Sequence, residues 1–180
     1  MSVADPWKSI QLVQGDITRQ DVDAIVNAAN STLLGGGGVD GAIHRAAGPE
    51  LLEACRKLGG CDTGSAKITP GFKLPAEYVI HAVGPRYRDG QHGEAQALAS
   101  CYGKAIELAE AHQCKTVAFS AISCGVYGYP IESAARVSMR AVADALSRHE
   151  YPNQVRWVLF NDEIYGVFAA VLKELEGGGL

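Results

Sequence analysis

Long apolar runs are missing from this chain of 180 residues. A membrane-spanning helix needs about 20 consecutive apolar residues, and no run in the sequence approaches that length. The N-terminus, residues 1–6, also lacks the basic and then apolar segments of a secretory signal. These absences argue against a membrane protein and predict a cytoplasmic one.

Paired metal ligands and paired thiols are missing as well. The five cysteines are odd in number and scattered, and none forms a C-x-x-C pair. The five histidines are equally dispersed. Such thiols are typical of a reducing compartment rather than of a disulfide framework or a zinc site. We therefore expect neither a bound metal nor a cofactor.

An excess of positive charge is the third absence. The chain has 16 Lys and Arg residues against 20 Asp and Glu residues, which gives a net charge of −4. Proteins that bind nucleic acid through a groove depend on clustered basic side chains. The sequence shows no strong nucleic-acid signal, and backbone amides must supply most of the binding of any phosphate ligand.

Glycine, in contrast, is concentrated in one run at residues 35–38. Consecutive glycines leave the backbone free to adopt positive φ, and several N–H groups can then turn inward to bind an anion. The start of a predicted helix follows, and its partial positive charge favours the same anion. The carboxamides of Asn27 and Asn30 precede the run and the carboxylate of Asp40 follows it. The segment predicts a phosphate site with polar chemistry at both edges.

Three other interpretations of the glycine run are less favoured. A P-loop ends in Gly-Lys-Ser/Thr, whereas Val39 and Asp40 stand at that place and the carboxylate repels a triphosphate. A Rossmann fingerprint has its glycines directly after the first strand, whereas residues 27–30 intervene here. A flexible surface linker is rich in Ser, Glu or Lys, whereas the flanks of this run are apolar.

Strand and helix patterns alternate along the chain. Strands are predicted at 9–13, 24–27, 66–69, 78–82, 116–119 and 155–160, and helices at 41–58 with a break at 48–49, 94–113, 131–149 and 163–175. This order predicts an α/β fold with helices on both faces of a largely parallel sheet. We expect one domain over residues 1–176 and a disordered tail at 177–180.

A second glycine-containing loop, at residues 123–130, follows the strand predicted at 116–119. Ligands of parallel α/β sheets sit beyond the carboxyl ends of the strands. Because both loops follow strands, we expect them on the same edge. Two such loops facing one another suit a diphosphate better than a single phosphate.

Five segments carry a family resemblance: QGDIT at 14–18, IVNAAN at 25–30, GGGGVDGAIH at 35–44, HAVGP at 81–85 and AISCGVYGYP at 121–130. With them the sequence resembles the macro domains, and among these the MacroD-type ADP-ribosyl hydrolases, close to bacterial O-acetyl-ADP-ribose deacetylases. The resemblance spans nearly the whole chain. It implies a three-layer α/β/α sandwich with a mixed, largely parallel sheet and a cleft for ADP-ribose. Ser120 and Cys124 depart from the pattern, at places where Pro and Thr or Ser are frequent.

The resemblance assigns the adenine to the N-terminal and C-terminal parts of the chain. Asp16 is expected to accept a hydrogen bond from the adenine amino group, which suits an acceptor-only carboxylate, and the Ile17 amide lies beside it. The alternative for Asp16 is a turn capped by its own side chain. Phe160 is expected to stack on adenine, and its alternative is a core position.

The distal ribose is assigned to Asn30 and Asp40, the two predicted catalytic residues. The amide of Asn30 can both donate to and accept from vicinal hydroxyls, and Asp40 near the anionic diphosphate can orient or activate water. The alternatives are an Asx turn for Asn30 and a helix N-cap for Asp40. Asn27 is grouped with the binding residues, although bracing the loop is its more natural role. His44, one turn after Asp40, could modulate it or be a satisfied helix histidine.

The diphosphate is assigned to both loops, with the amides of Ser123, Gly125, Val126 and Tyr127 wrapping it and Tyr127 against the distal ribose. A Cys124 thiolate stabilised there would make the cleft sensitive to oxidation. The remaining predicted contacts with substrate are Gly37, Gly38, Val39 and Cys124.

The expected activity is metal-independent hydrolysis at the distal ribose of ADP-ribose derivatives. The expected substrates are ADP-ribose carrying an acetyl ester and mono-ADP-ribose linked to a protein side chain. Two alternatives remain: a non-catalytic ADP-ribose-binding module, and an RNA-associated regulator. The sequence does not indicate a partner protein.

Overall fold

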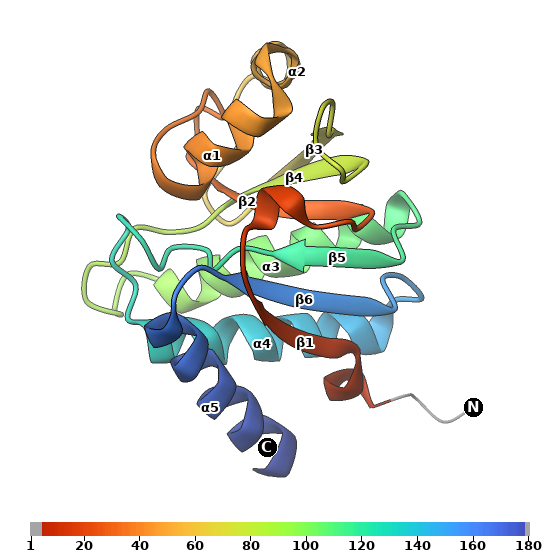
Figure 1. Cartoon of the computed structure of the whole chain (residues 1–180). Coiled ribbons are helices and arrows are strands. Elements are labelled where there is room, and N and C mark those ends of the chain that lie inside the picture. Colours follow the sequence, from red (N-terminus) through yellow and green to blue (C-terminus); the bar gives the residue numbers. More distant parts are fainter. Residues whose placement is uncertain (1–4, 179–180) are drawn as a thin grey trace.

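A central sheet lies between two layers of helices in the computed structural model, which describes residues 5–178 (Figure 1). Over these residues the sheet has six strands in the order β1-β6-β5-β2-β4-β3. Their bounds are β1 Ile10–Gln14, β2 Ala24–Ala29, β3 Ala66–Pro70, β4 Tyr78–Val83, β5 Thr116–Phe119 and β6 Gln154–Leu159. β3 runs antiparallel to β4, and the other neighbours are parallel. The predicted α/β/α sandwich with a mixed, largely parallel sheet is confirmed.

Helices cover both faces of the sheet. Their bounds are α1 Gly38–Ala47, α2 Pro49–Leu58, α3 Glu94–Ala111, α4 Ile131–Arg148 and α5 Asp162–Gly178. Figure 1 shows α1 and α2 on one side of the strands and α3, α4 and α5 on the other. None of the helices in the described range is both long and apolar enough to span a membrane.

The core consists of two apolar clusters, one on each face. Successive side chains of a strand point to opposite faces, so Ile25 packs under α1 and α2 while Val26 packs against the α3–α4 layer. Trp157 and Phe119 are fully buried and stack at a ring-centroid distance of 5.0 Å. Burial on both faces explains why the central strands are continuous apolar runs in the sequence.

After two neighbouring parallel strands, the chain turns toward opposite faces of the sheet. β2 and β5 are paired in parallel, with Ala24 opposite Val117 and Val26 opposite Phe119. β2 leads into α1 on one face, whereas β5 leads into α4 on the other. Such a divergence opens a crevice beyond the carboxyl ends of the two strands, where open α/β sheets bind ligands. The predicted placement of both loops on one edge is confirmed.

Element boundaries differ from the prediction at a few places. α1 begins at Gly38 rather than at residue 41, so Asp40 is part of the helix. The short 3-10 helices η1 (Pro6–Ser9) and η2 (Ile17–Arg19) were not predicted. α5 is continuous to Gly178, and residues 179–180 of the predicted tail lie outside the described residues.

Candidate functional site

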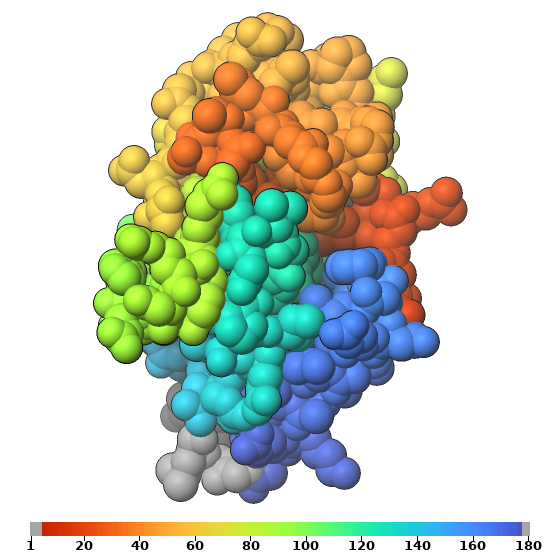
Figure 2. Space-filling model, turned by 90° about the vertical axis from the view of Figure 1, so that its left-hand side faces the viewer, coloured from red at the N-terminus to blue at the C-terminus, as the bar shows by residue number. Residues whose placement is uncertain are grey.

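Two loops form the candidate site, at the edge of the sheet that faces the viewer in Figure 2. We call residues 30–37, between β2 and α1, the first loop, and residues 120–130, between β5 and α4, the second loop. In Figure 2 the orange first loop and α1 lie above the teal second loop, with the blue start of α5 beside it. Sequence positions almost 100 apart therefore form one surface.

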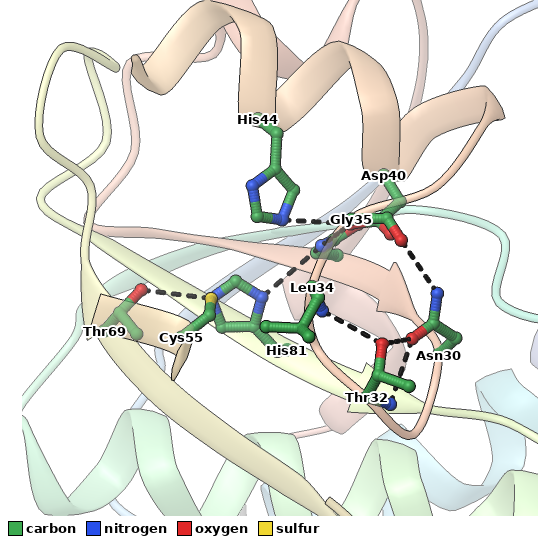
Figure 3. A network of polar contacts seen from close by, with 10 residues as sticks. Asn30, Thr32, Leu34, Gly35, Asp40, His44, Cys55, Thr69 and His81 are labelled. Atoms are coloured by element: carbon green, nitrogen blue, oxygen red, sulfur yellow. Dashed lines mark hydrogen bonds and ion pairs between the residues drawn. The ribbon is translucent and has the colours of Figure 1, made fainter. Parts of the chain in front are cut away.

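The Asn30 side chain ties the first loop together (Figure 3). Its Oδ1 accepts a hydrogen bond from the Thr32 amide at 3.0 Å and another from the Thr32 hydroxyl, and its Nδ2 donates to the Gly35 carbonyl at 2.9 Å. The Asx turn considered for Asn30 is thus present. A loop held in this way is not the flexible linker of the third interpretation.

The Asp40 carboxylate is buried at the start of α1, with 5% of the residue exposed. The helix N-cap is Gly37, with no side-chain cap, so the alternative of Asp40 as N-cap is wrong. Asp40 Oδ1 accepts a hydrogen bond from Asn27 Nδ2 at 2.8 Å. The other oxygen faces the first loop, because a Cβ at Gly36 would lie 3.3 Å from Asp40 Oδ2 and 3.4 Å from Asn30 Nδ2. The two predicted catalytic side chains therefore converge at Gly36.

Asn27 and His44 lie behind this carboxylate. Asn27 has no exposed surface, so its predicted contact with substrate is not possible in this structure, and it braces Asp40 instead. His44 Nε2 is buried and 3.4 Å from Asp40 Oδ1. That nitrogen has no hydrogen-bond partner among the described residues, so His44 is not the satisfied helix histidine of the alternative.

The second loop presents main-chain donors. Hydrogen bonds within the loop use the amides of Cys124, Gly128 and Tyr129. The four residues expected to wrap a diphosphate are Ser123, Gly125, Val126 and Tyr127, and their amides are in no hydrogen bond within residues 5–178. The amides of residues 35–40, in the first loop and the first turn of α1, are also in no hydrogen bond of the described residues. This second group includes the predicted contacts Gly37, Gly38 and Val39.

Asp16 and Phe160 follow the adjacent strands β1 and β6. Asp16 Oδ1 accepts hydrogen bonds from the Thr18 amide at 2.9 Å and the Thr18 hydroxyl at 2.7 Å. The hydrogen bond from the Thr18 hydroxyl, followed by that from the Thr18 amide, lowers the pKa of Asp16. The capped turn considered for Asp16 is present. Ile17 is buried, and its amide is in no hydrogen bond of the described chain. Phe160 is 77% exposed, so the core alternative for this side chain is wrong.

Comparison with known proteins decides the family. The sequence matches the Macro domain family over residues 26–138. Macro domain-containing protein CT2219 of Chlorobaculum tepidum is 55% identical over 163 residues, which cover 91% of this chain and 95% of that protein. The chain belongs to the macro domain family.

Two further relatives of this macro domain have more specific names. The O-acetyl-ADP-ribose deacetylase of Salmonella typhimurium is 52% identical over 169 residues, which cover 92% of this chain and 94% of that protein. Among solved structures, a mutant Oceanobacillus iheyensis macrodomain with ADPR superposes with a TM-score of 0.91 at 40% identity, covering 98% of this chain and 97% of that one. The resemblance noted in the sequence is confirmed.

A third loop of the macro domain, residues 84–93, supports the second loop. The Tyr87 amide donates to the Tyr127 carbonyl at 2.8 Å, and Ser123 Oγ donates to the Pro85 carbonyl at 2.8 Å. The guanidinium carbon of Arg86 lies 4.8 Å from the centroid of the Tyr127 ring. The sequence did not indicate this support, because it depends on β4 and β5 lying on either side of β2 in the sheet.

Cys124 of the second loop is not poised for oxidation. Burial raises the pKa of its thiol to about 12. The loop therefore does not stabilise a thiolate, and the hypothesis of a redox-sensitive cleft loses its physical basis.

One group of three residues in the described chain has metal-ligand geometry, namely Asp89, His92 and Glu94. Several of their polar atoms already form hydrogen bonds within this loop. Glu94 accepts four backbone amides, those of residues 88, 89, 90 and 92, and Asp89 Oδ1 accepts from His92 Nδ1 at 2.8 Å. The sequence did not indicate this cluster, because its two carboxylates and one histidine do not form a His and Cys spacing. Its role in the structure is to fasten the loop of residues 84–93.

Proposed function

We propose that this macro domain is a hydrolase acting at the distal ribose of ADP-ribose derivatives, with acetyl esters of ADP-ribose as one substrate and protein-linked mono-ADP-ribose as another. The arrangement of the sheet edge supports this assignment. Neighbouring strands lie about 4.8 Å apart, and their ends carry Asp16 and Phe160, then the second loop, then the first loop. This order matches adenine, diphosphate and distal ribose.

The observation that carries the proposal is that the two oxygens of the Asp40 carboxylate have different surroundings. Oδ1 is held from behind by Asn27, while Oδ2 lies beside Gly36 and Asn30 on the loop side. A carboxylate with one oxygen anchored and the other directed at a ligand is suited to hold a water molecule in a fixed orientation.

In the proposed reaction, the free amides of both loops bind the diphosphate and Asn30 orients the ribose hydroxyls. A water molecule lies between Asp40 Oδ2 and a diphosphate oxygen. Its oxygen bonds to the acetyl carbon, the bond between that carbon and the ribose oxygen breaks, and the proton of the water is passed to the leaving oxygen. ADP-ribose and acetic acid are the products. Positioning supplies most of the acceleration, and no side chain becomes acylated.

The test compares turnover with binding. Purified protein is incubated in parallel with acetylated and protein-linked ADP-ribose, with and without EDTA, and ADP-ribose affinity is measured by calorimetry. We expect unchanged turnover in EDTA. Asp40→Ala and Asn30→Ala should lose about 100-fold or more in kcat, with affinity changed only a few-fold. Asp144→Ala, an exposed carboxylate on α4, is the matched control.

Full turnover in both the Asp40→Ala and the Asn30→Ala variants would exclude the assigned chemistry. Wild-type protein that binds ADP-ribose but hydrolyses neither substrate would instead be a binding module. That candidate is favoured by relatives whose names state only a macro domain.

A further inference from the structure

A group of polar side chains lies inside the apolar cluster beneath α1 and α2. Asn27, Thr69 and His81 come from the three neighbouring strands β2, β3 and β4, and each is at most 4% exposed. Asn27 and His81 are direct partners in the β2–β4 register. Polar groups in such a place are unfavourable unless they are hydrogen-bonded. The hydrogen-bond partners of these three side chains therefore indicate the role of each one.

The hydrogen bonds fix one tautomer of His81. Asn27 Nδ2 must face Asp40 Oδ1, because the amide oxygen would be repelled by the carboxylate. The same nitrogen is 3.4 Å from His81 Nδ1, which must then be an acceptor. The proton consequently resides on Nε2, which is 3.0 Å from Thr69 Oγ1 (Figure 3). Asn27 of β2 thus holds Nδ1 of the ring, and Thr69 of β3 holds Nε2.

The surroundings of the ring keep it neutral. Burial, followed by the nearby His44 of α1, lowers the pKa of His81 to about 3. The other titratable groups that face it are Cys55 of α2, whose Sγ is 3.7 Å from Nε2, and Asp40, which is reached through Asn27. A second proton on the ring would place an N–H group against the Asn27 amide hydrogens. A neutral ring is therefore the form that the network requires.

We propose that His81 is a positioning residue for hydrolysis, acting through Asn27 on Asp40. By accepting one hydrogen of the Asn27 amide, it directs the other hydrogen to Asp40 Oδ1. The carboxylate is then held with Oδ2 on the side of Asn30. The kinetic consequence rests on the proposed function, whereas the tautomer and the hydrogen bonds do not.

Two substitutions separate positioning from packing. His81→Gln retains a carbonyl acceptor and an amide donor, whereas His81→Leu has neither. We expect His81→Leu to lower kcat on the acetyl ester about 10- to 100-fold, with KM and the Kd for ADP-ribose within about twofold. His81→Gln should recover most of that loss. Cys55→Ala, which removes a neighbour of the same ring, is the matched control and should leave kcat unchanged.

A purely structural role predicts another pattern. In that case both His81 variants would lose affinity, turnover and thermal stability together, and Gln would not rescue. That result overturns the proposal, as does a kcat of the Leu variant equal to that of wild type.

A second measurement does not depend on turnover. Long-range ¹H–¹⁵N NMR of the wild-type protein should show His81 neutral, protonated on Nε2 only, over about pH 5 to 8 where an ordinary histidine titrates. A ring that carries its proton on Nδ1, or that titrates in this range, overturns the proposal. If wild-type protein hydrolyses neither substrate while the spectrum is as expected, the proposed function fails and the hydrogen-bond network stands.

Discussion

The first and second loops are held in place by different parts of the chain. Side chains fix the first loop: Asn30 bonds Thr32 and Gly35 within it, and Asn27 holds Asp40 behind it. The second loop is fixed mainly through the main chain, as in the bonds of Tyr129 to Ser123 and of Tyr87 to Tyr127. The first loop and the start of α1 thus present the Asn30 and Asp40 side chains as well as main-chain amides, whereas the second loop presents main-chain amides.

This difference separates chemistry from binding. Backbone N–H groups bind an anion wherever the chain can be curved around it, and they do not depend on which side chains the loop carries. Val126, at 92% exposure, makes no side-chain contribution to the fold of its loop. A water molecule, in contrast, must be oriented by a particular oxygen atom. We expect damage to the first loop to lower kcat more than affinity, and damage to the second loop to weaken mainly affinity.

The strongest test of this separation is at Gly84. A Cβ at this position would lie 2.3 Å from Ser123 Oγ and 2.4 Å from Ile122 Cγ2, and both are buried residues of the second loop. Overpacking of this kind costs about 1–3 kcal/mol, so Gly84→Ala should weaken ADP-ribose binding by about 10- to 100-fold, measured by calorimetry. Gly103→Ala, with open space around it, is the control. Equal affinities in the two variants would contradict the role of the second loop.

The matching test of the first loop is at Gly41. A Cβ there would lie 2.6 Å from the Gly36 carbonyl oxygen, so Gly41→Ala should push the loop away from α1. Small displacements of a positioning group reduce rate steeply. We expect kcat to fall by about tenfold, while the Kd for ADP-ribose changes less than in the Gly84 variant. If Gly41→Ala lowers the affinity for ADP-ribose by a larger factor than kcat, the two loops do not have the separate roles assigned to them.

A smaller effect is expected from the support of the second loop at Glu94. Backbone hydrogen bonds, that from Arg88 foremost, lower the pKa of Glu94 from 4.5 to about 2. Because the folded-state pKa is depressed, its stabilising contribution is present above about pH 4.5 and is lost as the pH falls toward 2. Glu94→Gln should melt a few degrees lower at pH 7. Thermal unfolding at several pH values should show this difference shrinking below pH 4.5, and a constant difference would contradict the assignment.

The smallest effect is expected at Arg86, whose guanidinium stacks over the Tyr127 ring. An exposed cation–π contact contributes about 0.5–1 kcal/mol, so Arg86→Ala should weaken ADP-ribose binding about two- to fivefold. Arg86→Lys keeps the charge and serves as the comparison in the same titration. A fall in kcat at unchanged affinity would place Arg86 with the first loop instead.

The sequence predicted the site where its signal was local. The glycine run, the carboxamides before it and the carboxylate after it are adjacent in the chain, and the alternation of strands and helices placed both loops on one edge. Family resemblance named the same four second-loop amides that have no hydrogen bond within the described residues. The roles of Asn30 and Asp40 in catalysis, like the contacts of Asp16 and Phe160 with adenine, remain predictions.

The chain by itself determined the type of fold and the residues at the strand ends, because hydrophobic periodicity and glycine content act over a few neighbouring residues. Only the tertiary structure decided which way those residues point. Pairing β2 with β4 set Asn27 against His81 and turned it inward toward Asp40. Packing residues 84–93 against the second loop brought the Tyr87 amide to the Tyr127 carbonyl and the Pro85 carbonyl to the Ser123 hydroxyl. Such contacts join strands far apart in sequence, and strand order is established only when the whole sheet assembles.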